Sequence, residues 1–216
     1  RPGQMEVLNT DRVFQGIAGL VSFPVQSTIS RFLSSLRVIV ARQIADFNFD
    51  LLMKFRGNFK AFKSITLDLD SHVTPVYGNQ QRAGLGYNPK KKGRKSYHPL
   101  LCFLGETRDY LGGLFRSGKH HTSYHAVSFL KALIKRLPHH IEDIRIRADS
   151  GFFSGDIIRY LIKEHVEFYI VVPMQPWVQK KIQHLKEWNS IGRGIATGQC
   201  EYVFEKDASL RMVIVR

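Results

Sequence analysis

Two aspartates that close alternating segments are the residues of this sequence best suited to hold a divalent metal ion. In residues 65–70, apolar side chains alternate with polar ones that include Asp68 and Asp70. Such alternation is typical of a strand with one apolar face and, here, one acidic face. The segment 143–149, DIRIRAD, repeats the pattern and ends on Asp149. We therefore expect two strands that each present a carboxylate at their C-terminal end.

Carboxylate pairs of this kind suit the cleavage of a phosphodiester. Hard cations such as Mg²⁺ prefer carboxylate oxygens, and two of them about 3.5 to 4 Å apart can stabilise both the attacking and the leaving oxygen. Neighbouring strands run about 4.8 Å apart, so Asp70 and Asp149 can share a metal, Mg²⁺ or Mn²⁺. The alternative is an aspartate that caps a strand end or pairs with an arginine such as Arg147.

A polar loop between the two strands is the best candidate for a DNA contact. It is rich in Gly, Asn and Pro, is flanked by Tyr87 and Tyr97, and contains five closely spaced cations: Lys90, Lys91, Lys92, Arg94 and Lys95. We expect these cations, together with Arg147, to bind DNA phosphates, which would make binding sensitive to salt. A solvated loop without a special role is the alternative.

The elements that must position these residues begin with helices. From Ser27 to about Arg56, apolar residues recur at steps of three and four, which predicts one long amphipathic helix or two, with Ser27 as the N-cap. The stretch QSTISRFL could contact DNA or pack on the main domain.

The segments that follow predict a mixed α/β domain. After the strand at 65–70, two apolar runs at 98–106 and 109–118 predict a β-hairpin. A helix at about 122–137, the strand at 143–149, a helix capped by Ser154, and a buried strand at 166–173 come next. This order is the layout of the ribonuclease H-like fold, a mixed sheet flanked by helices.

The last segment differs in pattern. Beyond Pro173 we expect a short helix around residues 177–185, a glycine-rich turn and two alternating strands. We therefore divide the chain into a helical lead-in (1–60), an incomplete ribonuclease H-like catalytic core (61–172) and the start of a β-rich insertion (173–216).

The composition is that of a basic protein whose surface suits nucleic acid, and an ordinary basic soluble protein is the alternative. The formal net charge is +14, and the excess of Lys and Arg is spread over the whole chain, as expected for a broadly positive surface that attracts a phosphate backbone. Cys102 and Cys200 lie far apart and predict reduced thiols. No apolar run is long enough for a membrane span and no signal peptide is apparent, so we expect a cytoplasmic protein, associated with the nucleoid when active.

The remaining histidines and the two tryptophans each allow two interpretations. The histidines at positions 98, 120, 121 and 125 lack the paired spacing of a zinc site, and a charged helix N-terminus is the better interpretation. Trp177 and Trp188 could stack on unpaired bases, although such residues are more often part of a core.

Four stretches resemble the DDE transposases of bacterial insertion sequences, the group with a transposase DDE domain of the first type. They are LDLDSHVTPVYGNQ, GYNPKKKGRKSYHPLLCFLGETRDYLGGLFRSG, RADSGFFS and YIVVPMQPWVQKKI. The resemblance implies Mg²⁺-dependent cleavage of transposon ends, strand transfer into target DNA, and a homodimer on paired ends. It maps the first catalytic aspartate onto Asp70, with Asp68 as the substitute because His72 stands where the family has threonine, and the second onto Asp149.

The resemblance also implies a third carboxylate, a glutamate on a late helix in a Y-x2-R-x3-E arrangement. Tyr160, Lys163 and Glu167 mimic this spacing, but they precede the insertion, where the chain cannot bring Glu167 to the site. We expect the glutamate beyond Arg216 and the chain by itself to be inactive. The alternatives are a DNA-binding fragment of a truncated element without catalysis, and a host nuclease of the same fold.

Overall fold

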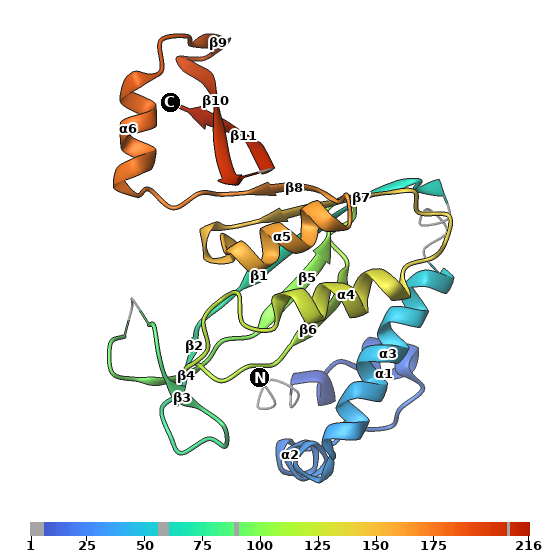
Figure 1. Ribbon diagram of the computed structural model, residues 1–216. Coiled ribbons are helices and arrows are strands. Elements are labelled where there is room, and N and C mark those ends of the chain that lie inside the picture. The colour runs from blue at the N-terminus through green and yellow to red at the C-terminus, as the bar shows by residue number, and fades with distance from the viewer. Residues whose placement is uncertain (1–6, 56–60, 89–90, 207) are drawn as a thin grey trace. The chain divides into compact units, whose positions relative to one another are not determined.

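A computed structural model describes residues 7–55, 61–88, 91–206 and 208–216. The chain forms two compact units, Arg1–Ala61 and Phe62–Arg216, each drawn in Figure 1. We describe them one after the other.

The first unit is helical. Its helices are α1 (Arg12–Ala18), α2 (Gln26–Ser35) and α3 (Val38–Phe55). The predicted amphipathic stretch is therefore two helices. The prediction that Ser27 caps it is wrong, because Ser27 lies inside α2 and the N-cap is Val25, which makes no side-chain capping hydrogen bond.

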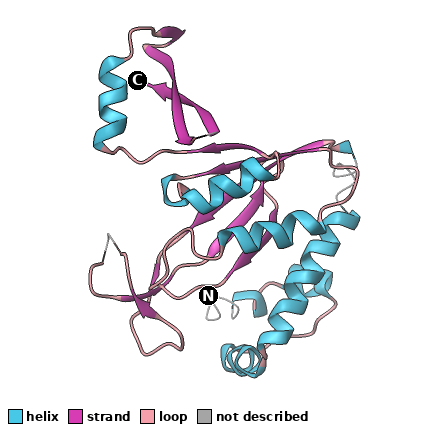
Figure 2. Ribbon diagram, viewed as in Figure 1, coloured by secondary structure: helices cyan, strands magenta, loops and turns pink. Residues whose placement is uncertain are grey.

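The second unit is built on a five-stranded sheet, shown in Figure 2. Its strands are β1 (Ser64–Ser71), β5 (Leu100–Leu104), β6 (Tyr110–Leu114), β7 (Asp143–Ala148) and β8 (Glu167–Ile170). Their spatial order is β6-β5-β1-β7-β8. β5 and β6 form the predicted hairpin, and β1, β7 and β8 run parallel to one another. The prediction of a mixed sheet flanked by helices is confirmed.

Two crossover helices cover one face of this sheet. Helix α4 (Ala126–Arg136) links β6 to β7, and α5 (Gly155–Lys163) links β7 to β8. Right-handed crossovers that proceed in the same direction put their helices on the same face, and Figure 1 shows α4 and α5 there. The prediction that Ser154 caps α5 is confirmed, since its Oγ accepts from the Ile157 N–H at 3.5 Å.

The core lies between these helices and the sheet. The buried side chains of β1 are those of Ile65, Leu67 and Leu69, at most 4% exposed. They share their face with the buried residues of β5 and β7, because Leu69 is in register with Cys102 and Ala148. The alternate residues of β1 and β7, among them the acidic ones, occupy the opposite face.

A small sheet that the sequence did not predict stands in the polar loop. It consists of β2 (Thr74–Pro75), β3 (Gly84–Leu85) and β4 (Lys95–Tyr97), in the order β2-β4-β3. Gly86 approaches the next loop so closely that a Cβ there would meet the Gly118 carbonyl oxygen at 1.8 Å. Only a glycine at this position allows the small sheet to pack on residues 117–119.

The last part of the second unit contains α6 (Pro176–His184), β9 (Asn189–Gly192), β10 (Ile195–Glu205) and β11 (Ala208–Val215). The two predicted strands are β10 and β11, which pair with each other, while β9 joins them as a third strand that the sequence did not predict. In the described part of the chain, no helix combines the length and hydropathy needed to cross a membrane.

Candidate active site

Asp70 and Asp149 stand at equivalent positions of two neighbouring parallel strands. The β1–β7 register pairs Leu69 with Ala148, and each aspartate is the next residue of its chain. Asp149 continues the extended backbone of β7, with φ −77° and ψ 178°, so the alternation of side chains persists. The two carboxylates therefore leave the same face of the sheet, and both residues are exposed. Adjacent strands are separated by about 4.8 Å.

Each of these carboxylates is oriented by a backbone N–H. One carboxylate oxygen of Asp70 accepts from the Ser71 N–H at 2.7 Å. Asp149 accepts from the Gly151 N–H at 2.9 Å and so caps the short helix Ser150–Phe152. In the part of the chain that the structure describes, neither carboxylate forms an ion pair with a Lys or Arg. Their outer oxygens remain available to a cation.

Asp68 differs from Asp70 in having an arginine partner. The guanidinium of Arg147 donates two hydrogen bonds to the Asp68 carboxylate, at 2.7 and 2.6 Å. This bidentate hydrogen bonding raises the pKa of Arg147. The arginine pairing that the sequence offered as an alternative to metal binding is thus what the structure has at Asp68. The geometry favours Asp70 as the metal ligand.

Arg116, a buried arginine that was not predicted to belong to the site, hydrogen-bonds to several segments at this edge of the sheet. Arg116 is 3% exposed. It donates to the carbonyl oxygens of His98 (2.8 Å), Thr122 (2.7 Å) and Tyr124 (2.8 Å), and to the Oγ of Ser71 at 2.8 Å. Burial lowers its pKa to about 10, so it remains charged at neutral pH. An isolated arginine after an apolar run carries no signal of such a role.

The loop that Arg116 holds also reaches the Asp149 turn. His98 is buried, and its Nδ1 lies 3.0 Å from the His120 carbonyl oxygen. Burial lowers the pKa of His98, and the nearby charge of Asp149 opposes that shift. A Cβ on Gly151 would lie 2.8 Å from the Thr122 side chain. The loop of residues 117–125, which we call the Arg116 loop, therefore packs close to both aspartates.

The donor set fits part of a divalent metal site. Asp70 and Asp149 offer hard carboxylate oxygens at one exposed edge, which is what Mg²⁺ or Mn²⁺ requires. Within the described ranges, no group of three or more His, Cys, Asp or Glu residues is arranged to hold a metal ion. The residues present thus supply two of the carboxylates that such a site uses.

The glutamate that mimics the family spacing lies away from these aspartates. Glu167 begins β8, in register with Arg145, and its carboxylate accepts from the Tyr169 hydroxyl at 2.5 Å. Asp149 is four residues further along the parallel strand, a separation of about 13 Å at roughly 3.3 Å per residue. Glu167 therefore lies too far away to serve as a third metal ligand beside Asp70 and Asp149.

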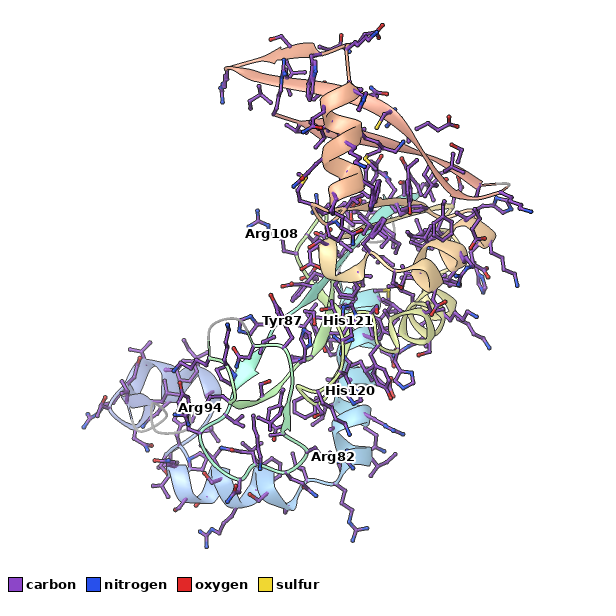
Figure 3. All side chains as sticks on the ribbon, turned by 60° about the vertical axis from the view of Figure 1, so that its left-hand side comes forward. Arg82, Tyr87, Arg94, Arg108, His120 and His121 are labelled. Carbon is purple, nitrogen blue, oxygen red and sulfur yellow. The ribbon has the colours of Figure 1, made fainter. Side chains whose placement is uncertain are left out.

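The cations of the predicted basic loop lie between β3 and β4 and at the start of β4. Lys90 lies outside the described residues; Lys91, Lys92, Arg94 and Lys95 are exposed. Lys91 and Arg94 lie over the Tyr77 ring, at 4.6 and 5.0 Å from its centroid. Lys91 also hydrogen-bonds the Tyr77 hydroxyl, which lowers the pKa of Tyr77. Figure 3 shows Arg82, Tyr87 and Arg94 in this region.

The two tryptophans are half-buried and pack on side chains of this chain. Trp177 stacks on Tyr202 with ring centroids 4.9 Å apart, and the Arg216 guanidinium lies 3.9 Å from the Trp188 ring centroid. Base stacking by either tryptophan stays a prediction.

Comparison with known proteins identifies the family. The family described as "Transposase DDE domain group 1" matches residues 3–203, so the chain belongs to this transposase family. No curated protein matches the chain. The solved structures that are similar include the piggyBac transposase synaptic complex with hairpin DNA (TM-score 0.41, 13% identity) and the Drosophila P element transposase strand transfer complex (TM-score 0.37, 11% identity).

These structural similarities are partial. The first covers 68% of this chain and 32% of the piggyBac chain; the second covers 81% of this chain and 40% of the P element chain. The chain thus spans less than half the length of either transposase.

Proposed function

We propose that this protein hydrolyses the phosphodiester at transposon ends and then uses the freed 3′-hydroxyl to attack target DNA. The observation that carries the proposal is the equivalent placement of Asp70 and Asp149 on parallel strands, with both carboxylates exposed and neither in an ion pair with a Lys or Arg among the described residues. Membership of the transposase family supports it. In the hydrolysis, the oxygen of water bonds to phosphorus and the bond between phosphorus and the 3′ oxygen breaks, which leaves a 5′-phosphate and a free 3′-hydroxyl. In the transfer, that 3′ oxygen bonds to a target phosphorus, and the bond between this phosphorus and the 3′ oxygen of the target strand breaks, which leaves a 3′-hydroxyl on the target.

In this proposal each residue has a defined part. Asp70 and Asp149 hold Mg²⁺ or Mn²⁺, and Ser71 and Gly151 orient them through their backbone N–H groups. When bound, the metal stabilises charge on the attacking and leaving oxygens. The third carboxylate, a glutamate expected beyond Arg216, remains a prediction. The Asp68 carboxylate accepts hydrogen bonds from Arg147, so we assign Asp68 a structural role.

The DNA partner is proposed on the basis of charge. The net charge is +14, and the exposed cations Lys91, Lys92, Arg94 and Lys95, with Lys90 as predicted, would bind phosphates beside the site. Arg147 remains a candidate for the same role through the exposed 62% of its side chain. Each phosphate contact steepens the salt dependence of binding. A homodimer on paired ends is part of the same proposal.

The domain division is likewise proposed: a helical lead-in at 1–60, a catalytic core at 61–172, and the start of an insertion at 173–216. The second unit, Phe62–Arg216, contains both the sheet with the aspartates and the later strands.

Iron-mediated cleavage of the polypeptide tests the metal site without requiring turnover. With Fe²⁺ in place of Mg²⁺, ascorbate and peroxide generate radicals that cut the backbone next to the bound metal. We expect cuts near residues 70 and 149, suppressed by excess Mg²⁺. Asp70→Asn and Asp149→Asn should each remove both cuts, and Asp68→Asn should leave them. Cuts that survive Asp70→Asn but disappear in Asp68→Asn would make Asp68 the ligand.

Nicking of DNA tests the activity. The protein encoded by the complete gene should nick duplex DNA that carries the ends of its own element with Mg²⁺ or Mn²⁺ and not with EDTA. Asp149→Ala should abolish nicking and leave DNA binding intact. Nicking by the Asp149→Ala variant would contradict the assignment of Asp149 as a catalytic residue. Binding without cleavage under any metal would indicate a DNA-binding fragment, and cleavage without strand transfer would indicate a nuclease.

A further inference from the structure

A cationic and aromatic pocket opens beside the Arg116 loop. Its volume is about 430 Å³, which is within the range of small-ligand sites. The lining side chains that could contact a ligand are those of Arg82, Phe115, Lys119, His120, Tyr124 and His125. No Asp or Glu is among the described residues that line it. The pocket therefore has the charge of an anion site.

Aromatic side chains form a large part of the pocket lining. His120 and Tyr124 are stacked with ring centroids 3.9 Å apart and an angle of 11° between their planes. His125 meets the Tyr124 ring edge-on at 4.0 Å. Phe115 is 66% exposed although its ring contacts Tyr97. A binding site for a bare anion would not need these ring surfaces, whereas a base can stack on them.

Close packing of Gly84 on the side chains of Ser117 and Lys119 holds the walls of the pocket together. A Cβ on Gly84 would lie 2.3 Å from the Ser117 Oγ and 3.3 Å from the Lys119 Cβ. This contact joins the segment that carries Arg82 to the segment that carries Lys119 and His120. Figure 3 shows Arg82 and His120 in the same part of the unit and Arg108 away from both. The cations and the rings thus come from two segments that are fixed to each other.

The pocket is also connected to the candidate active site. Arg116 lines it and donates to the Oγ of Ser71, the residue that follows Asp70. Desolvation lowers the pKa of His120, and the neighbouring cations Lys119 and Arg116 lower it further. An electropositive pocket therefore adjoins the edge of the sheet where the aspartates stand.

We propose that this pocket binds one unpaired nucleotide of the DNA strand next to the phosphodiester that is cut. Arg82 and Lys119 bind its phosphate, and the base stacks against the rings of His120, Tyr124 and Phe115. The position next to the cut phosphodiester rests on the proposed function. Binding of an unpaired nucleotide can be measured without metal and without cleavage.

Fluorescence of 2-aminopurine tests the proposal in the 216-residue chain. One probe is a duplex with a single unpaired 2-aminopurine in EDTA, and the other is the same duplex with that base paired. We expect quenching of the unpaired base on binding and tighter binding of that duplex. Tyr124→Leu and Arg82→Gln should each weaken binding of the unpaired duplex about fivefold or more, as expected for the loss of stacking or of a phosphate contact. Both residues are exposed, and a thermal melt checks that the variants are folded.

Arg108→Gln is the matched control, because Arg108 is an exposed arginine that does not line the pocket. It removes the same charge and should reduce binding of the paired and unpaired duplexes alike, by less than Arg82→Gln reduces binding of the unpaired one. The proposal is overturned if Arg82→Gln and Arg108→Gln weaken binding equally, or if the unpaired base gives no preference. It is also overturned if inorganic phosphate competes as well as a nucleoside monophosphate. Asp149→Asn should keep the preference, so a failure of metal binding is distinguishable from a failure of this pocket.

Discussion

The guanidinium of Arg116 donates a 2.8 Å hydrogen bond to the Oγ of Ser71, and this bond joins the end of β6 to the end of β1. The same group donates to the Thr122 and Tyr124 carbonyl oxygens. It therefore connects the strand that carries Asp70 with the loop that packs against the Asp149 turn. A buried cation with several neutral acceptors is costly to remove, because each acceptor loses a charged donor.

Replacement of Arg116 should destabilise the second unit. Arg116→Met fills a similar volume but removes the donor to the carbonyl oxygens of His98, Thr122 and Tyr124, and we expect it to lower the free energy of unfolding by about 3 kcal/mol. Arg116→Lys keeps the charge and one direction of donation and should recover part of this loss. Urea denaturation measures both. Arg108→Met, at an exposed position, should change the value by about 0.5 kcal/mol or less. Equal losses at positions 116 and 108 would contradict the role of Arg116.

The Asp68–Arg147 pair should contribute modestly to stability and not to metal binding. Both side chains are partly exposed, at 29% and 62%, so solvent screens the pair, although its bidentate geometry is favourable. A double-mutant cycle of Asp68→Asn and Arg147→Gln should give a small favourable coupling that decreases at high salt. Arg147→Gln should leave iron-mediated cleavage at residues 70 and 149 unchanged. Loss of that cleavage would show that Arg147 positions the metal site.

Two apolar runs predicted the β5–β6 hairpin. Period-two alternation was enough to predict β1 and β7, because both strands bury alternate side chains under α4 and α5. It could not separate Asp68 from Asp70, since residues two apart on a strand share a face. Tertiary pairing distinguishes them: the parallel strand brings Arg147 level with Asp68.

Other features left no periodic signal. The strands β2 and β3 have two residues each, too few for a pattern, and they exist because glycines allow close packing on residues 117–119. Arg116 is a charged residue whose burial depends on acceptors from separate places in the chain: the His98 carbonyl, the carbonyls of Thr122 and Tyr124, and the Ser71 hydroxyl. Ser27 failed as a cap because the helix begins before it, at Gln26.

Alanine should lower the melting temperature at Gly86, which packs against backbone, and not at Gly112, which does not. In Gly86→Ala the new methyl would lie 1.8 Å from the Gly118 carbonyl oxygen, a backbone atom that cannot move without breaking the contact. We expect a lower melting temperature and weaker binding of the unpaired-base duplex. In Gly112→Ala the methyl would meet only the Phe129 ring, at 3.9 Å, and the melting temperature should hardly change. Similar melting curves for the two variants would contradict the packing.

The two cysteines should differ in reactivity. Both are free, as predicted; Cys102 is 0% exposed in β5, and Cys200 is half-buried. Burial raises the pKa of Cys102 to about 12 from an ordinary value of 9.0. Because the thiolate is the reactive form, iodoacetamide at pH 8.5 should label Cys200 and spare Cys102, as read by mass spectrometry, and both should react in urea.

The same shift predicts how stability depends on pH. The folded chain keeps the Cys102 proton above the pH at which the unfolded thiol ionises. Its contribution to stability is therefore complete below about pH 9 and is lost as the pH rises toward about 12. Cys102→Ala should make the fall in melting temperature above pH 9 shallower than in the unchanged protein. Equal slopes, or labelling of Cys102 in the folded chain as fast as Cys200, would show that the thiol is not enclosed by the core.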